Sequence, residues 1–119
     1  MGRRVALGKV GEAMAAEELV RQGYRIVDRN YRCRLGELDI IAMDGDSLVF
    51  VEVRRRSKDR YGTALQTVNR GKQQQIARVA NYYLETKKPV FRECRFDVVG
   101  VTGEALVVVK DAFRLGELA

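Results

Sequence analysis

The sequence predicts a single α/β domain in which a mixed β-sheet is flanked by α-helices. Two amphipathic segments with helical periodicity are separated by runs rich in β-branched and aromatic residues, which are typical of strands. Helical and strand-like segments in this order are typical of one layered α/β domain. The 119 residues (1–119) are expected to form a single domain, because a chain of this length can bury a core without disulfides.

The first helix is expected from about Gly8 to Gln22, with Gly23 suited to the position just after its end. Its apolar stripe, which includes Ala16 and Leu19, should pack on the sheet. The carboxyl group of Glu12 falls near the middle of that stripe. A lone carboxylate there is costly without a partner, so Glu12 is a candidate functional residue.

Three strands are expected next, at about Tyr24–Tyr31, Glu37–Asp44 and Ser47–Arg55. Gly45-Asp46 forms a two-residue loop that joins the last two strands into a tight hairpin. The strand at Ser47–Arg55 carries apolar residues on both of its faces. This pattern is typical of a central strand that is covered on both sides.

A second helix is expected from the cap residue Asn69 to about Leu84, with Lys72 on its apolar stripe. Strands at Arg95–Val101 and Ala105–Lys110 then form a second hairpin. The predicted order is therefore one helix, three strands, a second helix and two strands.

The two-residue loop sets the register of the first hairpin. It places Asp39 directly opposite Glu52, and Glu37 opposite Arg54, with all four side chains on one face. Opposite residues have Cβ atoms about 5 Å apart, and like charges there are destabilising. We therefore expect a divalent cation between the carboxylates of Asp39 and Glu52, and Mg²⁺ or Mn²⁺ suits such oxygen ligands. Glu12 would join this cluster from the first helix.

The net charge of +6 comes from 22 basic and 16 acidic residues. A basic balance favours a polyanionic partner, either nucleic acid or an anionic membrane surface. Carboxylates, a metal ion and a neighbouring cation together describe metal-assisted phosphodiester hydrolysis, which favours nucleic acid. The basic residues expected to hold it are Arg32, Arg34, Arg55, Arg56, Lys58, Arg60, Arg70 and Lys72.

Several classes of chemistry are excluded. The chain has no histidine, which rules out Ser-His and Cys-His catalysis and HExxH zinc sites. Cys33 and Cys94 have no metal-ligand spacing and are interpreted as reduced thiols of a cytoplasmic protein, although one bridge between them stays open. Because no apolar run approaches membrane-spanning length, no membrane partner is expected.

Asp39, followed by Glu52-Val53-Arg54 and preceded by a helical Glu12, resembles the PD-(D/E)xK nuclease superfamily of restriction-type enzymes and archaeal Holliday-junction resolvases. The chain is more closely similar to the YraN-like group of uncharacterised bacterial proteins. That resemblance covers nearly the full length and is carried by Gly11-Glu12, Gly36-Glu37-Leu38-Asp39-Ile40-Ile41-Ala42, Val49-Phe50-Val51-Glu52-Val53, Lys72 and Arg95-Phe96-Asp97-Val98-Val99.

The resemblance implies a three-layer restriction-endonuclease-like fold, with a four-stranded mixed core sheet flanked by helices. It also implies that Asp39 and Glu52 are metal ligands and that Glu12 is an accessory acid. The function predicted on this basis is metal-dependent hydrolysis of structured or branched nucleic acid, with DNA favoured over RNA.

One position departs from the superfamily pattern, which usually has Lys where this chain has Arg54. Arginine stays charged and can clamp a phosphate through two hydrogen bonds, but it cannot act as a general base. Lys72 is a candidate to stand in for the missing lysine if it reaches the site. The departure also keeps open a second prediction, namely a nucleic-acid-binding module that has lost catalysis.

Structural interpretations remain open for each candidate. Arg54 can form a cross-strand ion pair with Glu37, Glu12 can pair with Lys72, and the two sheet carboxylates can be held by nearby arginines. Asp97 is interpreted as a structural hydrogen-bonding residue. A third class of function is also open, namely a protein-interaction module, which could form a homodimer through its strand edges.

Overall fold

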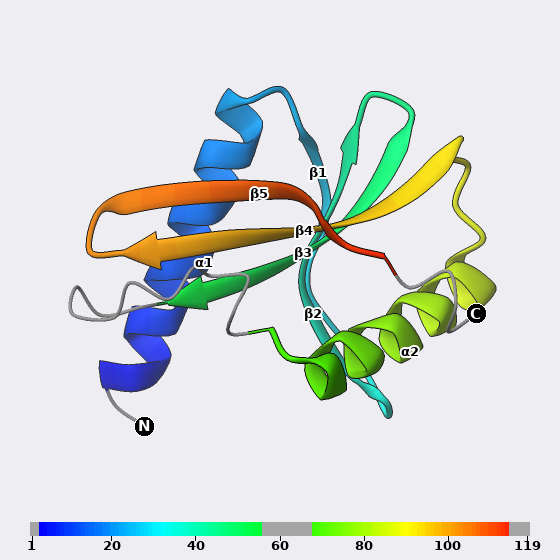
Figure 1. Cartoon of the computed structure of the whole chain (residues 1–119), viewed down its shortest axis with the longest axis horizontal. Helices are drawn as coiled ribbons and strands as arrows, with labels where there is room; N and C mark the ends of the chain where they lie inside the picture. The colour runs from blue at the N-terminus through cyan, green and yellow to red at the C-terminus, as the bar shows by residue number, and fades with distance from the viewer. Residues whose placement is uncertain (1–2, 56–67, 115–119) are drawn as a thin grey trace.

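A computed structural model describes residues 3–55 and 68–114, with the side chains of the first range described from residue 9 onward (Figure 1). The described residues form two helices and five strands. In chain order these are α1 (Arg3–Arg21), β1 (Arg25–Cys33), β2 (Gly36–Asp44), β3 (Ser47–Arg55), α2 (Arg70–Lys87), β4 (Glu93–Thr102) and β5 (Ala105–Phe113).

The five strands form one mixed sheet in the order β1-β2-β3-β4-β5. Strands β3 and β4 are parallel, and every other neighbouring pair is antiparallel. The parallel pair follows from α2, which connects β3 to β4, since parallel neighbours need a crossover connection. The α/β class and the five strands expected from the residue patterns are confirmed. The resemblance implied a core of four strands, whereas the described residues form a sheet of five.

Strand β3 lies at the centre of the sheet, as its two apolar faces predict. Side chains alternate along it, so Leu48 and Phe50 face one side and Val49 and Val51 face the other. All four side chains are at most 1% exposed. The central strand therefore has a packed core on each face.

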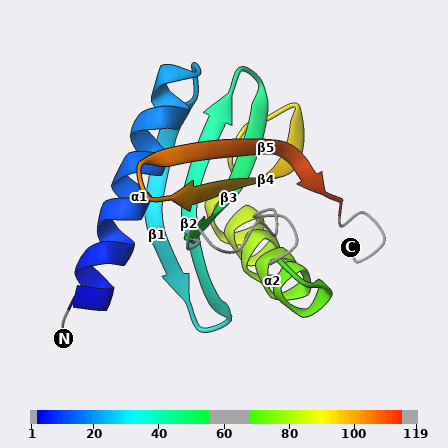
Figure 2. The same cartoon turned by 60° about the vertical axis from the view of Figure 1, so that its left-hand side comes forward.

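The two helices supply these two cores. On one face, α1 packs on β3 through Ala15, Ala16 and Leu19, which contact Val49 and Val51. We call this whole group the α1-side cluster. On the opposite face, the α2-side cluster joins α2 to Leu48 and Phe50 through Ile76, Val79, Ala80 and Tyr83. Figure 2 shows the sheet passing between the two helices.

The helix ends follow local chemistry. Asn69 caps α2, because its side-chain oxygen accepts a hydrogen bond from the backbone N of Lys72 at 2.9 Å. The helix continues three residues beyond the expected Leu84 and ends at Lys88, which adopts the left-handed conformation (φ 46°). This cap fixes Lys72 in the first turn of α2, where it faces the sheet beside β3.

Asp97 is completely buried in β4 and is held by several donors. The hydroxyl of Tyr24 donates to it at 2.6 Å, Arg95 Nε at 2.9 Å and the backbone N of Asp111 at 2.9 Å. These contacts agree with the structural interpretation of Asp97.

Cys33 and Cys94 are both free thiols, so they form no bridge. Within residues 3–55 and 68–114, no helix is long and apolar enough to cross a membrane.

Candidate functional site

The β2–β3 hairpin has the predicted register at its closed end. Pairing runs from Asp44–Ser47 to Ile40–Val51 around the two-residue loop, where Gly45 has a φ of 60°. The described ladder stops at Ile40–Val51, one pair before the expected Asp39–Glu52 pair. We call the point where the two strands part the fork.

Asp39 forms the fork. Its Oδ2 accepts a hydrogen bond from the backbone N of Val53 at 2.8 Å, so a side chain takes the place of a backbone partner. Leu38 belongs to the α2-side cluster and Ile40 to the α1-side cluster, although residues two apart normally share a face. The alternation therefore breaks at Asp39. The expectation that Glu37, Asp39, Glu52 and Arg54 share one face is wrong for this reason.

The cross-strand ion pair between Glu37 and Arg54, which the sequence left open as an alternative, does not form among the described residues. Glu37 Oε2 lies 3.0 Å from Arg32 Nε on the neighbouring strand β1. Arg54 Nε instead lies 3.4 Å from Glu52 Oε2 on its own strand. This Nε atom of Arg54 is buried and has no hydrogen-bond partner among the described residues. The fork separates Glu37 from β3 and leaves Arg54 beside the buried carboxylate.

Glu52 is 7% exposed and is approached by two cations. Besides Arg54, Lys72 Nζ from α2 lies 3.6 Å from its Oε2. The pKa of Glu52 is raised to about 7. Burial is the largest cause, the negative charge of Asp39 and a hydrogen bond between the two carboxyl groups also raise it, and Lys72 and Arg54 oppose the rise. The two sheet carboxyl groups therefore meet at the fork, although they are not a ladder pair. At neutral pH this arrangement favours an added positive charge.

Glu12 approaches the same fork from α1. Burial raises the pKa of its carboxyl group, and so does the charge of Asp39, while a hydrogen bond with Asn30 and the charge of Arg29 lower it. In the part of the chain that the structure describes, the ion pair of Lys72 is with Glu52 and not with Glu12. Glu12 and Glu52 thus flank Asp39 from the two opposite sides of the sheet.

Asn30 is a site residue that the sequence analysis missed. It lies on β1 between the pairs Arg29–Ile40 and Tyr31–Leu38, which places it opposite Asp39. Its φ is 55°, a left-handed conformation that asparagine tolerates better than most residues. An asparagine inside a run that otherwise favours a strand was the signal, because asparagine is depleted in strands.

The site thus draws its polar side chains from five elements: Glu12 from α1, Asn30 from β1, Asp39 from β2, Glu52 and Arg54 from β3, and Lys72 from α2. As they are placed, no three histidine, cysteine, aspartate or glutamate side chains of the described residues are grouped closely enough to hold a metal ion. The pair at the fork, Asp39 and Glu52, remains the candidate oxygen donor set. Magnesium is usually bound by one or two carboxylates and keeps several waters, so two adjacent carboxylates fit it.

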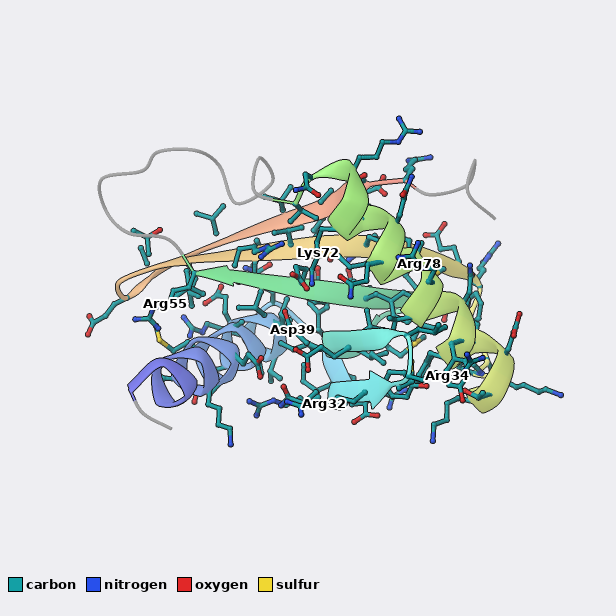
Figure 3. The ribbon with its side chains drawn as sticks, turned by 90° about the horizontal axis from the view of Figure 1, so that it is seen from below. Arg32, Arg34, Asp39, Arg55, Lys72 and Arg78 are labelled. Carbon is teal, nitrogen blue, oxygen red and sulfur yellow. The ribbon has the colours of Figure 1, made fainter. Side chains whose placement is uncertain are left out.

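Basic side chains surround the fork (Figure 3). In this view Asp39 lies near the middle, with Arg55 toward α1 and Arg34 and Arg78 toward α2. A Cβ added to Gly11 of α1 would lie 3.7 Å from Nη1 of Arg55, so that guanidinium packs next to the Glu12 turn. Such a rim of cations is suited to the phosphates of a polyanion.

Of the eight predicted nucleic-acid contacts, five are in described parts of the chain. The exposed ones are Arg32, Arg34, Arg55 and Arg70, and Lys72 is half-buried beside Glu52. The other three, Arg56, Lys58 and Arg60, lie outside the described residues. Arg78, exposed on α2, is a basic residue of this side that the sequence analysis did not include.

Comparison with known sequences identifies relatives over most of the chain. Residues 11–101 match the sequence model described as "Uncharacterised protein family UPF0102". A UPF0102 protein of Syntrophus aciditrophicus is 47% identical over 119 residues, which cover 97% of this chain and 94% of the relative. A UPF0102 protein of Moorella thermoacetica is 50% identical over 79% of this chain and 78% of its own length. A UPF0102 protein of Symbiobacterium thermophilum is 52% identical over 85% of this chain and 84% of its own length. These matches confirm the resemblance to the YraN-like group.

Proposed function

The chain belongs to the uncharacterised protein family UPF0102, and we propose that it is a metal-dependent endonuclease acting on structured or branched nucleic acid, with DNA favoured over RNA. The observation that carries the proposal is the meeting of the Asp39 and Glu52 carboxyl groups at the fork. Two adjacent carboxylates in a partly buried place repel each other when both are ionised, and a bound cation would relieve that repulsion. In this proposal, α1, the sheet and α2 are the three layers of a restriction-endonuclease-like domain.

Asp39 and Glu52 would hold Mg²⁺ or Mn²⁺, because both supply the hard oxygen donors that these ions prefer. The ion would supply Lewis-acid stabilisation of the scissile phosphate and a nucleophile at neutral pH. Glu12, on the opposite side of Asp39, would accept a proton or orient a water molecule through its carboxylate. Asn30 would fix the orientation of Glu12 through their hydrogen bond.

The two cations at Glu52 would have different tasks. Arg54 stays charged and has a buried Nε that no described residue accepts from, so its guanidinium suits an oxygen of the bound phosphate. Lys72 presents a compact ammonium group from α2, 3.6 Å from the same oxygen, Glu52 Oε2. A lysine there can orient the attacking water and stabilise developing negative charge.

A nucleic-acid-binding module without catalysis is the second candidate function. Two observations favour it: Arg54 stands where nucleases of this pattern usually have lysine, and the described carboxylates form no group of three around one point. The two candidates share the basic rim and differ in turnover. Metal-dependent cleavage therefore separates them, and binding alone does not.

Cleavage of a four-way DNA junction and of a forked duplex, with Mg²⁺ or Mn²⁺, tests the proposal. Asp39→Asn and Glu52→Gln should each lower the rate by more than about a hundredfold while the far-ultraviolet circular dichroism stays that of the wild type. Glu104→Gln, a neutralised carboxylate on the exposed β4–β5 turn, is the matched control and should cleave normally. Equal cleavage by wild type and Asp39→Asn would reject the nuclease. Binding without any turnover would favour the second candidate.

A further inference from the structure

A second feature lies away from the carboxylates, where the β1–β2 turn meets the last turns of α2. A pocket of about 370 Å³ opens there. Its walls include Tyr31, Arg32 and Arg34 from the strand side and Tyr82, Thr86 and Lys87 from α2. We call it the turn pocket.

The turn pocket is basic. None of the described residues that line it is acidic, whereas three of them carry a positive charge. Arg32 is paired with Glu37 at 3.0 Å, but within the described ranges neither Arg34 nor Lys87 forms an ion pair with a carboxylate. Two uncompensated cations at one opening attract an anionic ligand such as a phosphate.

The pocket also offers a stacking surface. The guanidinium carbon of Arg34 lies 6.0 Å from the ring centroid of Tyr82, with Arg34 exposed and Tyr82 half-buried. A base placed between two planar groups needs about 7 Å, two contacts of about 3.5 Å each. A small movement of the exposed arginine would therefore admit a base. Tyrosine rings and arginine planes are the surfaces on which proteins stack unpaired bases.

Strand β1 connects this pocket to the fork. Asn30 lies opposite Asp39, and Arg34 follows it four residues later, just beyond the end of the strand. At about 3.3 Å per residue, this separation is about 13 Å. A nucleic-acid strand with one phosphate at the fork would reach the turn pocket within a few nucleotides.

We infer that the turn pocket binds an unpaired nucleotide of the substrate, with its base stacked between Tyr82 and Arg34 and its phosphate on Lys87. This inference rests on the proposed function and narrows its substrate class to nucleic acids with a single-stranded segment next to the cleaved position. A base inside an intact duplex is paired and stacked, so it enters such a pocket only at the cost of unstacking. The pocket would thus distinguish tailed and branched substrates from continuous duplex.

Fluorescence anisotropy with labelled DNA tests the inference without requiring cleavage. The probes are a blunt duplex and the same duplex with a 5′ or a 3′ single-stranded tail, in Ca²⁺ buffer. The wild type should prefer one of the tailed probes over the blunt one. Tyr82→Leu and Arg34→Gln should each lower that preference about tenfold, in line with the loss of one stacked base.

Two further variants separate stacking from general effects. Tyr82→Phe keeps the aromatic face and should keep the preference. Arg21→Gln removes one positive charge from α1, where Arg21 pairs with Glu18 at 3.1 Å and does not line the turn pocket. This variant should also keep the preference for the tailed probe. A 2-aminopurine in the tail should be quenched at one position, and Tyr82→Leu should abolish that quenching.

An unchanged preference in Tyr82→Leu and Arg34→Gln would overturn the inference, and so would a wild type that binds all three probes equally or not at all. Failure of the nuclease proposal has a different signature. In that case the wild type would still show the preference and the position-specific quenching, while no probe would be cleaved in Mg²⁺ or Mn²⁺.

Discussion

Glu52 and Asp97 are both buried carboxylates of the sheet, and their surroundings separate a functional residue from a structural one. Asp97 is held by Tyr24, Arg95 and a backbone N–H at 2.6 to 2.9 Å. Glu52 has a second carboxyl group beside it, and its pKa is raised to about 7. A carboxylate that folding leaves in such an unfavourable place is a candidate for cation binding.

The raised pKa predicts how Glu52 affects stability. Because the folded state binds its proton more tightly than the unfolded state, stability falls as pH rises from about 4.5 to about 7. In metal-free protein, Glu52→Gln should therefore raise the free energy of unfolding at pH 8 by about 1–3 kcal/mol, and by little at pH 4. Urea unfolding at the two pH values measures this. A destabilised Glu52→Gln protein at pH 8 would show that Glu52 is a well-compensated structural residue.

Lys72 and Arg54 can be tested as a pair. Lys72→Met should lower the cleavage rate about a hundredfold, since it removes the ammonium group beside Glu52. Arg54→Lys in the same protein should restore part of that rate, because it returns a lysine to the β3 side of the carboxylate. Mn²⁺ affinity should not fall in Lys72→Met, since a neighbouring positive charge is lost. Full activity in Lys72→Met, or no recovery in the double variant, would remove Lys72 from the mechanism.

At the scale of elements, β2 shows what the sequence could and could not predict. The Gly45-Asp46 loop correctly set the register as far as Ile40–Val51, because loop length fixes hairpin pairing. The fork was not predictable from alternation, since it depends on a hydrogen bond from the Val53 backbone to the Asp39 side chain. A pattern of period two assumes that backbone pairs with backbone throughout.

The neighbouring element β1 shows the same limit. Its extent was predicted to within two residues, but the left-handed Asn30 opposite Asp39 was not. The contact of Glu12 with this strand was also beyond the sequence, because helical periodicity gives the face of α1 and not its position along the sheet. Sequence therefore located the site residues correctly in the elements and mistook how they face one another.

Two substitutions of Asn30 separate its backbone and side-chain roles. Asn30→Ala places a Cβ-bearing residue with no polar group at φ 55° and should lower stability by about 1 kcal/mol. Asn30→Gly accepts that conformation and should unfold within a few tenths of a kcal/mol of the wild type. Both lose the hydrogen bond with Glu12, so both should cleave more slowly. Thermal unfolding and cleavage rates distinguish the two effects, and a wild-type rate in Asn30→Gly would exclude a positioning role.

At the scale of the whole molecule, charge is distributed unevenly. The basic rim surrounds the fork and the turn pocket, whereas Glu17, Glu18 and Glu104 gather at a separate groove beside α1 and the β4–β5 turn. Among the described residues, basic and acidic side chains therefore gather at different places on the molecule. Such asymmetry orients a protein on a polyanion and speeds their encounter.

This asymmetry makes the salt dependence of DNA binding informative. Removing one phosphate contact should lower the slope of log affinity against log salt by about 1. Arg78→Gln, on the basic side, should show that decrease. Arg114→Gln, near the end of β5 and paired with Asp111 at 2.8 Å, should leave the slope unchanged. Equal slopes for both variants would place the DNA on a different face.

Calorimetric titration with Mn²⁺ tests the central claim, a cation site at the fork, most directly. The wild type should bind in a single specific event that the Asp39→Asn/Glu52→Gln double variant loses and that Glu104→Gln retains. Because the ion displaces a proton from Glu52, affinity should rise about tenfold per pH unit below 7 and level off above it. Equal Mn²⁺ binding by the wild type and the folded double variant, or none by either with and without branched DNA, would contradict the account.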